Sequence, residues 1–343
     1  MAKTWIIAGL LLAFAVAPGQ AADRLFTIGS WGGDYTEAQR KALFDPFAEK
    51  HGIKYDVATY SGGTAEFKAM KQTGQALWDA VTVETPDLVA GCDDGLFERL
   101  DWARLGGKDR LVPGAASECG AGALVLGLVL GYRAGGGAQP KSWADFWDVE
   151  AFPGKRGMRK SPRSTLEAAL MADGVSPDKV YEVLSTPEGV DRAFHKLAEL
   201  KPNILWWEAT AQSAEWLATG EVVMSMSPST RIWSRVQNGA NLGIVWNEAI
   251  YLMDSWVIPA NSPYLDTAYA FLKWVTSPEA QAAMINIYPL GPTAVGADKL
   301  IRDDLKPYVT DEARLKQGLI DSETFWVDHL EELNKRFNAW LSR

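Results

Sequence analysis

The sequence predicts an α/β fold, because apolar segments of strand length alternate with segments that have helical periodicity. Residues 25–28 form the first apolar segment, and a helix is predicted over 35–50, where apolar side chains recur on one face. The same order repeats in a strand over 54–60 with a helix over 64–73, and again in a strand over 79–84 that leads into a further helix. This rhythm is typical of a largely parallel sheet covered by helices.

The turns that follow these three strands are the first candidates for a ligand site. In open α/β sheets, ligands bind beyond the carboxyl ends of the strands. The first turn contains the sequence SWGGD over 30–34, the second contains SGG over 61–63, and the third begins at Glu84. Both of the first two turns are rich in glycine, which permits tight turns and a close approach of backbone to ligand.

A second α/β region is predicted to begin near Tyr132, after a long apolar run. It contains expected helices over 165–173, 187–200 and 210–219, and an expected strand over 221–226. Another strand-like run, 255–258, leads the chain back, and the last third is mostly helical, ending in an amphipathic helix over 325–341. Two lobes joined by two crossings of the chain fit this order of elements.

Residues 1–21 predict a cleaved secretion signal. Lys3 precedes a run of 12 apolar residues, and Gly19 and Ala21 occupy the small-residue positions of a cleavage site. The run is shorter than the ~20 residues that span a bilayer core. The alternative, a buried core helix, lacks an amphipathic face. We therefore expect export to the periplasm and no membrane insertion of the mature chain.

Composition and charge argue against several classes of function. The net charge of -9 disfavours binding to nucleic acid, which needs a basic surface. The 3 His lie far apart, without zinc-ligand spacing, so no metal site is expected. Nucleotide-binding glycine loops and the Gly-x-Ser-x-Gly elbow are missing from the sequence, so neither a cofactor nor enzymatic activity is expected. An exported hydrolase is the alternative class, because spacing alone does not exclude two carboxylates that converge in a cleft.

Cys92 and Cys119 are the two cysteines, and we expect them to form one disulfide. An even number of cysteines in an exported chain favours this pairing. Closing a loop of this length contributes about 3–4 kcal/mol in the chain-entropy model. A catalytic thiol is the alternative, but neither cysteine has a histidine close in sequence.

Several motifs, in their order along the chain, resemble those of a known family. They are SWGGDY over 30–35, GLFERLDW over 95–102, PKSWADFWD over 140–148, FPGKRG over 152–157, MDSWVIPA over 253–260 and SPEAQ over 277–281. By these motifs the chain resembles the periplasmic solute-binding proteins of ABC transporters, in the spermidine/putrescine-binding branch. The resemblance covers nearly the whole chain after the signal.

The resemblance implies a two-lobed periplasmic binding protein fold of type II, with a hinge and a central ligand cleft. We place the first lobe at 22–131 plus 257–343 and the second at 132–256. The family captures a small solute between its lobes and delivers it to the permease subunits of a membrane transporter, without breaking a bond in it. We expect a monomer that acts in this way. A ferric-ion binder would share the fold, but its usual pair of adjacent tyrosines is missing here.

The resemblance also assigns roles to individual residues. Asp254 matches the acidic position that pairs with an amine of the ligand, although it could instead only begin a strand. Trp31 matches the aromatic residue that stacks on the ligand, with a core position as the alternative. Gly32 and Gly33 either let the backbone approach the ligand or only form the turn. Trp256 belongs to the same motif as Asp254 and joins the candidate set.

Further candidates lie at strand ends and in the second lobe. Thr64 either offers the ligand a helix N-terminus or only caps the helix. Glu84 is a second acid that could face the cleft. Of the consecutive pair at 206 and 207, we favour Trp207 as the cleft residue, because neighbouring side chains of a strand point to opposite faces.

Basic residues depart from the polyamine pattern in the second lobe. The polyamine binders have acidic side chains there, whereas this chain has Arg163 in the stretch 158–165, and Ser227 and Arg231 in the stretch 227–231. An arginine fork binds a carboxylate bidentately. The family default is therefore a polyamine such as putrescine or spermidine, and the alternative is a zwitterionic ω-amino acid such as γ-aminobutyrate (GABA), with its carboxylate on an arginine. Both arginines could also be surface residues.

Overall fold

The computed structural model describes residues 24–135 and 137–343, so the predicted signal over 1–21 lies outside the described residues. In the described part of the chain, nine strands form one mixed sheet in the order β2-β1-β3-β8-β4-β7-β5-β6, with β9 paired to β8. The strands are β1 (Phe26–Ser30), β2 (Tyr55–Thr59), β3 (Ala80–Glu84), β4 (Ala121–Arg133), β5 (Arg156–Arg159), β6 (Ile204–Trp207), β7 (Met224–Pro228), β8 (Leu242–Val257) and β9 (Leu319–Ile320).

Helices cover both faces of this sheet. The α-helices are α1 (Gly33–Gln39), α2 (Asp45–His51), α3 (Ala65–Thr73), α4 (Thr85–Asp93), α5 (Trp102–Leu105), α6 (Trp143–Trp147), α7 (Thr165–Ala172), α8 (Val180–Leu184), α9 (Pro187–Leu200), α10 (Thr210–Thr219), α11 (Ser229–Gln237), α12 (Leu265–Val275), α13 (Pro278–Ile285), α14 (Glu312–Gln317) and α15 (Glu323–Leu341). Shorter turns are the π-helical η1 (Arg40–Phe44) and the 3₁₀ segments η2 (Lys108–Arg110), η3 (Pro177–Lys179), η4 (Lys201–Asn203), η5 (Ala297–Leu300) and η6 (Lys306–Tyr308). Among the described residues, no helix is both long and apolar enough to span a membrane.

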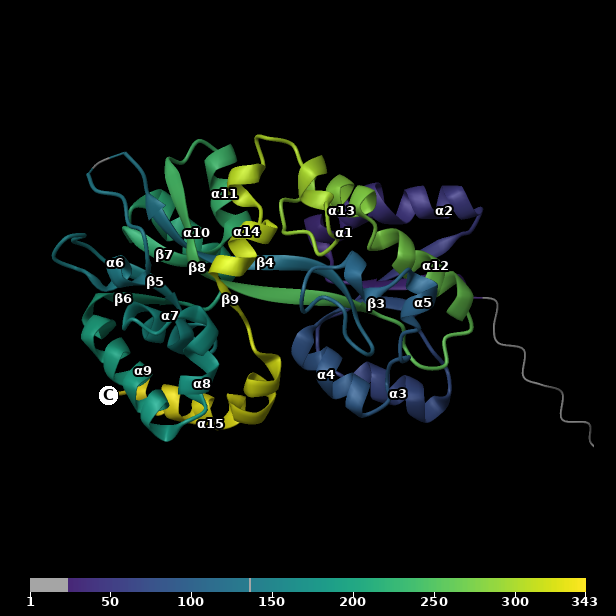
Figure 1. Ribbon diagram of the computed structural model, residues 1–343, viewed down its shortest axis with the longest axis horizontal. Helices are drawn as coiled ribbons and strands as arrows, with labels where there is room; N and C mark the ends of the chain where they lie inside the picture. The colour runs from purple at the N-terminus through teal and green to yellow at the C-terminus, as the bar shows by residue number, and fades with distance from the viewer. Residues whose placement is uncertain (1–23, 136) are drawn as a thin grey trace, which may run out of the picture.

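Two lobes lie side by side and are joined by the long strands β4 and β8 (Figure 1). The first lobe contains β1, β2 and β3 with the helices α1 to α5, α12 and α13. The second lobe contains β5, β6 and β7 with α6 to α11. Within each lobe these outer strands pair in parallel, as the strand–helix rhythm predicts, whereas β4 and β8 run antiparallel to each other. The two-lobed α/β prediction is therefore confirmed.

Each lobe has its own hydrophobic core, and the crossing strands contribute to both cores. In β4, Val125 and Val129 belong to the first core, whereas Leu128 and Leu130 belong to the second. The predicted lobe boundaries at 131/132 and 256/257 consequently fall inside strands rather than in loops.

The last helix departs from the predicted division of the chain. The sequence predicts that residues 257–343 belong to the first lobe, but α15 packs on the core of the second lobe. Its apolar face carries Phe337 and Trp340, whose rings lie against Phe194 of α9 and Trp206 of β6. Helix α15 therefore places its aromatic face on the second lobe, across the hinge, while it also contacts α4 of the first lobe.

The predicted disulfide is confirmed. Cys92, in α4, is bonded to Cys119, two residues before β4, and their Cα atoms are 5.8 Å apart. The bond joins a helix that follows β3 to the start of a crossing strand. It therefore restrains the first lobe where the chain enters the hinge.

Candidate functional site

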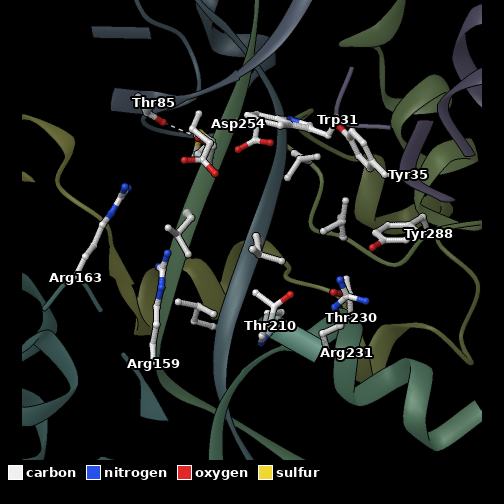
Figure 2. A pocket seen from close by; sticks show the side chains of 18 of the residues that line it. Trp31, Tyr35, Thr85, Arg159, Arg163, Thr210, Thr230, Arg231, Asp254 and Tyr288 are labelled. Carbon is white, nitrogen blue, oxygen red and sulfur yellow. Dashed lines mark hydrogen bonds between the residues drawn. The ribbon is translucent and has the colours of Figure 1, made fainter. Parts of the chain in front are cut away.

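A cavity of about 440 Å³ lies over the crossing strands, between the two lobes. Trp31 follows β1, and Glu84 is the last residue of β3, so both reach it from the carboxyl ends of parallel strands, as predicted. Asp254 of β8 lies at its floor. Figure 2 shows Trp31 extending over Asp254, with Tyr35 and Tyr288 on one side.

Glu84 and Asp254 form a pair of carboxylates on adjacent strands. They are directly opposite each other in the antiparallel pairing of β3 with β8, a position that places Cβ atoms roughly 4.5–5.5 Å apart. Burial raises the pKa of Asp254 to about 8, and the negative charge of Glu84 acts in the same direction. The neighbouring Trp31 and Arg163 act in the opposite direction. Among the described residues, Asp254 forms no ion pair, so a cation that enters from solvent would relieve this repulsion.

Trp31 is held from behind by a fixed aromatic neighbour. Its ring lies 4.9 Å from that of Tyr60, centroid to centroid, and the Tyr60 hydroxyl donates a 2.6 Å hydrogen bond to Asp87 Oδ2. The Trp31 Nε1 atom is buried and has no hydrogen-bond partner in the described part of the chain. The indole, with Tyr60 behind it, offers a ring face that can lie against a cation.

Three arginines reach the cavity from the second lobe: Arg159, Arg163 and Arg231. Arg163 is already neutralised, because its Nε and Nη2 atoms donate to Asp321 at 3.1 and 2.6 Å. In the described residues, Arg159 and Arg231 form no ion pair. In the view of Figure 2, Arg159 and Arg163 lie on one side of the crossing strands and Arg231 on the other, beside Thr230. The second lobe therefore presents two unpaired positive charges to the cavity.

Trp207 lines the cavity from β6, as predicted, and is held in place by its ring nitrogen. The Nε1 atom donates to the carbonyl of Met226 at 3.1 Å, so the indole is fixed on the sheet. Its neighbour Trp206 points the other way, towards α15. Strand alternation therefore separates the pair in the expected manner.

Five predicted residues do not line the cavity: Gly32, Gly33, Thr64, Ser227 and Trp256. The two glycines form the turn into α1, with φ angles of 80° and 60° that favour glycine. Thr64 precedes α3 without a side-chain cap. These three positions therefore shape the turns around the site rather than its wall.

Ser227 and Trp256 lie on the correct strands but in the interior. The Ser227 hydroxyl is buried 2.8 Å from that of Ser213. Trp256 lies on the same face of β8 as Asp254, but two residues further along, where its ring packs on Phe44 and Phe271. The assignment of Trp256 to the ligand site is corrected, because helices cover this part of the sheet.

The sequence reasoning missed several residues of the cavity wall. They include Tyr35, Thr85, Arg159, Thr210, Thr230 and Tyr288. The sequence could have predicted Arg159, because it ends the parallel strand β5 as Glu84 ends β3. Tyr288 had no such signal, since it lies after α13 and reaches the cavity only through the packing of the first lobe.

Comparison with known proteins agrees with this architecture. A family model described as bacterial extracellular solute-binding protein matches residues 42–313. The chain is 45% identical over 334 residues to a γ-aminobutyric acid-binding protein of Pseudomonas aeruginosa, covering 97% of this chain and 95% of that one.

Solved structures give the same picture. A solved structure described as a GABA receptor matches with a TM-score of 0.81 and 30% sequence identity, and the match covers 93% of this chain and 98% of that chain. An ABC transporter substrate-binding protein from Bradyrhizobium japonicum has a TM-score of 0.81 at 34% identity, over 92% and 98%. The chain therefore belongs to the family of bacterial extracellular solute-binding proteins and is the substrate-binding protein of an ABC importer.

Proposed function

We propose that the protein captures a zwitterionic ω-amino acid such as GABA, rather than a polyamine. The observation that carries this proposal is the distribution of charge around one cavity. The acidic pair, Glu84 and Asp254, lies on the side of the first lobe, and the unpaired arginines lie on the side of the second. A ligand with an ammonium at one end and a carboxylate at the other complements both sides.

In this proposal Asp254 binds the ammonium. A charge-assisted hydrogen bond from an ammonium is strong in a partly desolvated site. The incoming positive charge offsets the repulsion from Glu84, and the ring of Trp31 adds a cation–π contact of about 0.5–2 kcal/mol. Asp254 therefore gains most from a ligand cation.

Arg231 binds the carboxylate in the same proposal. It is the second residue after Ser229, where α11 begins, so its side chain reaches the cavity beside Thr230. Its planar fork suits two parallel hydrogen bonds to a carboxylate. The free N–H groups of the first helical turn favour the same negative charge.

A polyamine fits this wall poorly. Its far ammonium would meet Arg159 or Arg231, neither of which forms an ion pair in the described part of the chain. Like charges brought together on closure cost several kcal/mol. Two of the relatives named above carry GABA in their descriptions, which supports the same choice.

The capture itself is a hinge motion of the two lobes about β4 and β8. The ligand bridges both lobes, and the closed form is then the one that the permease subunits bind. We place this step in the periplasm, after removal of residues 1–21. The ligand is released unchanged, which separates this function from the hydrolase alternative.

Isothermal titration of the purified protein tests the proposal, with GABA, putrescine, spermidine and glutamate as ligands. We expect GABA to bind and the two polyamines to give no heat at the same concentrations. Thermal unfolding gives a second readout, because a ligand at 100 times its Kd adds about 2.7 kcal/mol of stability. Binding of putrescine but not GABA would overturn the proposal.

A further inference from the structure

Two charged side chains of the cavity have no role in the proposed binding of GABA. Asp254 and Arg231 are assigned to the ligand, and Arg163 is paired with Asp321. Glu84 and Arg159 remain, one from each lobe. A role for these two residues in ligand binding rests on the proposed function.

Glu84 is an exposed carboxylate at the end of β3. Among the described residues it forms no ion pair, and its nearest charged neighbour across the strand pair is Asp254, of the same sign. A single ligand ammonium that binds Asp254 neutralises one of these two charges. Glu84 is left with a surplus negative charge that faces the second lobe.

Arg159, on the opposite lobe, is a positive charge that has no ion-pair partner in the described residues. It is partly buried at the end of β5; burial lowers its pKa, Arg163 lowers it further, and the acids Glu84, Asp321 and Glu167 raise it. At the other end of the same strand, Arg156 is fully buried and donates to the carbonyl oxygens of Phe146, Gly154, Asp148 and Phe152. In the described residues the Arg159 side chain has no hydrogen-bond acceptor, whereas Arg156 on the same strand donates to four carbonyl oxygens.

One ligand carboxylate does not serve both free arginines. Arg159 and Arg231 lie on opposite sides of the crossing strands in Figure 2. A carboxylate that is held bidentately by Arg231 therefore leaves Arg159 without an ion-pair partner among the described residues. Closing the cleft over an unpaired guanidinium would be strongly unfavourable, because an uncompensated charge would be buried.

We infer that Glu84 and Arg159 pair across the cleft when the lobes close, and that this pair restricts the site to ligands of zero net charge. With Glu84 and Arg159 paired, the remaining charges are the negative Asp254 and the positive Arg231. A zwitterion neutralises both. A cationic ligand leaves a surplus positive charge in the closed site, and a dicarboxylate leaves a surplus negative charge. The pair thus disfavours ligands that carry a net charge as well as favouring the zwitterion.

A double-mutant cycle tests the pairing. We expect Glu84→Gln and Arg159→Gln each to weaken GABA binding about tenfold or more, because each leaves its partner's charge buried on closure. The variant with both substitutions should lose no more GABA affinity than either single variant. Its fold-loss in affinity is then about tenfold smaller than the product of the two single fold-losses. Additive losses would overturn the inference.

Ligand charge gives the second readout. Glu84→Gln should raise the affinity for glutamate relative to GABA, because the site then has one positive charge more. Arg159→Gln should raise the affinity for γ-aminobutyramide, a monocation, relative to GABA. If the wild type instead prefers glutamate and Arg159→Gln removes that preference, Arg159 binds a ligand carboxylate directly and the inference is wrong.

Lys160→Gln is the matched control. It removes a positive charge next to Arg159, but Lys160 is exposed, pairs with Glu208 and lies outside the cavity. We expect its GABA affinity to equal that of the wild type. Failure of the wild type to bind GABA would contradict the proposed function, whereas GABA binding with additive losses would contradict only the pairing of Glu84 with Arg159.

Discussion

Asp254 and Asp321 are two carboxylates beside the same crossing strand, and they differ in what faces them. Asp321 follows β9, which pairs with β8, and it receives two hydrogen bonds from Arg163. Asp254 lies on β8 itself and faces another carboxylate, Glu84. The fold therefore supplies a counter-charge to one and withholds it from the other.

This difference gives the two aspartates different roles at the hinge, a structural one for Asp321 and a ligand-binding one for Asp254. The Asp321 side chain is 2% exposed and forms its bonds without a ligand, so it stabilises the folded chain. The pKa of Asp254 is raised to about 8 by burial and by Glu84, which indicates a site that is short of positive charge. A strongly perturbed carboxyl in a cleft is a common mark of a binding site.

The largest effect is expected from breaking the satisfied pair. Asp321→Asn leaves the Arg163 guanidinium largely buried without its counter-charge, so we expect the free energy of unfolding to fall by about 3–5 kcal/mol. Urea denaturation at pH 7 measures this change. As a control, Asp303→Asn breaks the exposed pair with Lys306 and should leave stability nearly unchanged. Equal effects of the two substitutions would mean that Asp321 is not the structural member of the comparison.

Removing the unsatisfied charge should act on binding instead. Asp254→Asn deletes the proposed partner of the ammonium, and we expect GABA affinity to fall about 100-fold, as for a truncated charge pair that is desolvated. Stability of the empty protein should not fall, because the substitution removes the repulsion between Asp254 and Glu84. Titration calorimetry and thermal unfolding measure the two quantities. A destabilised variant that still binds GABA would reverse the roles of the two aspartates.

The sequence could predict one member of this comparison and not the other. Asp254 belongs to a local motif on a strand, and Trp31 and Glu84 follow strand ends, so short-range rules located all three. Asp321 and Arg163 are 158 residues apart, and their contact depends on the return of the chain through β9.

Long-range packing also explains the remaining errors. The aromatic face of α15 is visible in the sequence, but nothing local says which lobe it covers. Trp256 shows the converse limit, since its motif is correct while the helices that bury it come from distant segments. Periodicity locates the face of an element, whereas its partner is set by the tertiary fold.

A pH series sharpens the comparison at the ligand. The pKa of Asp254 is raised to about 8, so the carboxyl is largely protonated in the empty site at pH 6 and must lose a proton to bind an ammonium. GABA affinity should therefore rise by up to about tenfold per pH unit below pH 8 and then level off, while the ligand amine stays charged up to about pH 10.

Calorimetry in buffers of different ionisation enthalpy measures the proton released on binding. Asp254 is faced by Glu84 from β3, by Trp31 from the turn after β1 and by Arg163 from the second lobe. The residual binding of Asp254→Asn should not depend on pH over this range. An affinity of the wild type that is flat between pH 6 and 8 would show that Asp254 is already ionised in the empty cleft.

The smallest effect concerns the cluster behind Asp321. The Tyr181 hydroxyl donates a 3.1 Å hydrogen bond to the buried Glu167, which also accepts a 2.7 Å bond from Trp326 Nε1. Tyr181→Phe removes the bond to Glu167 and a longer 3.4 Å bond to Asp321 Oδ1 without a change of shape, so we expect a loss of about 1 kcal/mol in the free energy of unfolding. Tyr132→Phe is the control, because in the described part of the chain the Tyr132 hydroxyl forms no hydrogen bond.

The pH dependence of this loss shows which form of Glu167 the tyrosine stabilises. Burial and the charge of Asp321 together raise the pKa of Glu167 to about 8, against hydrogen bonds from Trp326 and Tyr181 that lower it. A raised carboxyl pKa gives stability that is present below pH 4.5 and is lost as the pH rises towards 8. Without Tyr181 that pKa rises further, so the loss in Tyr181→Phe should be larger at pH 8 than at pH 5. A loss of equal size at both values would mean that Tyr181 binds the neutral acid as strongly as the carboxylate, and that this cluster, unlike the Asp254 site, is indifferent to charge.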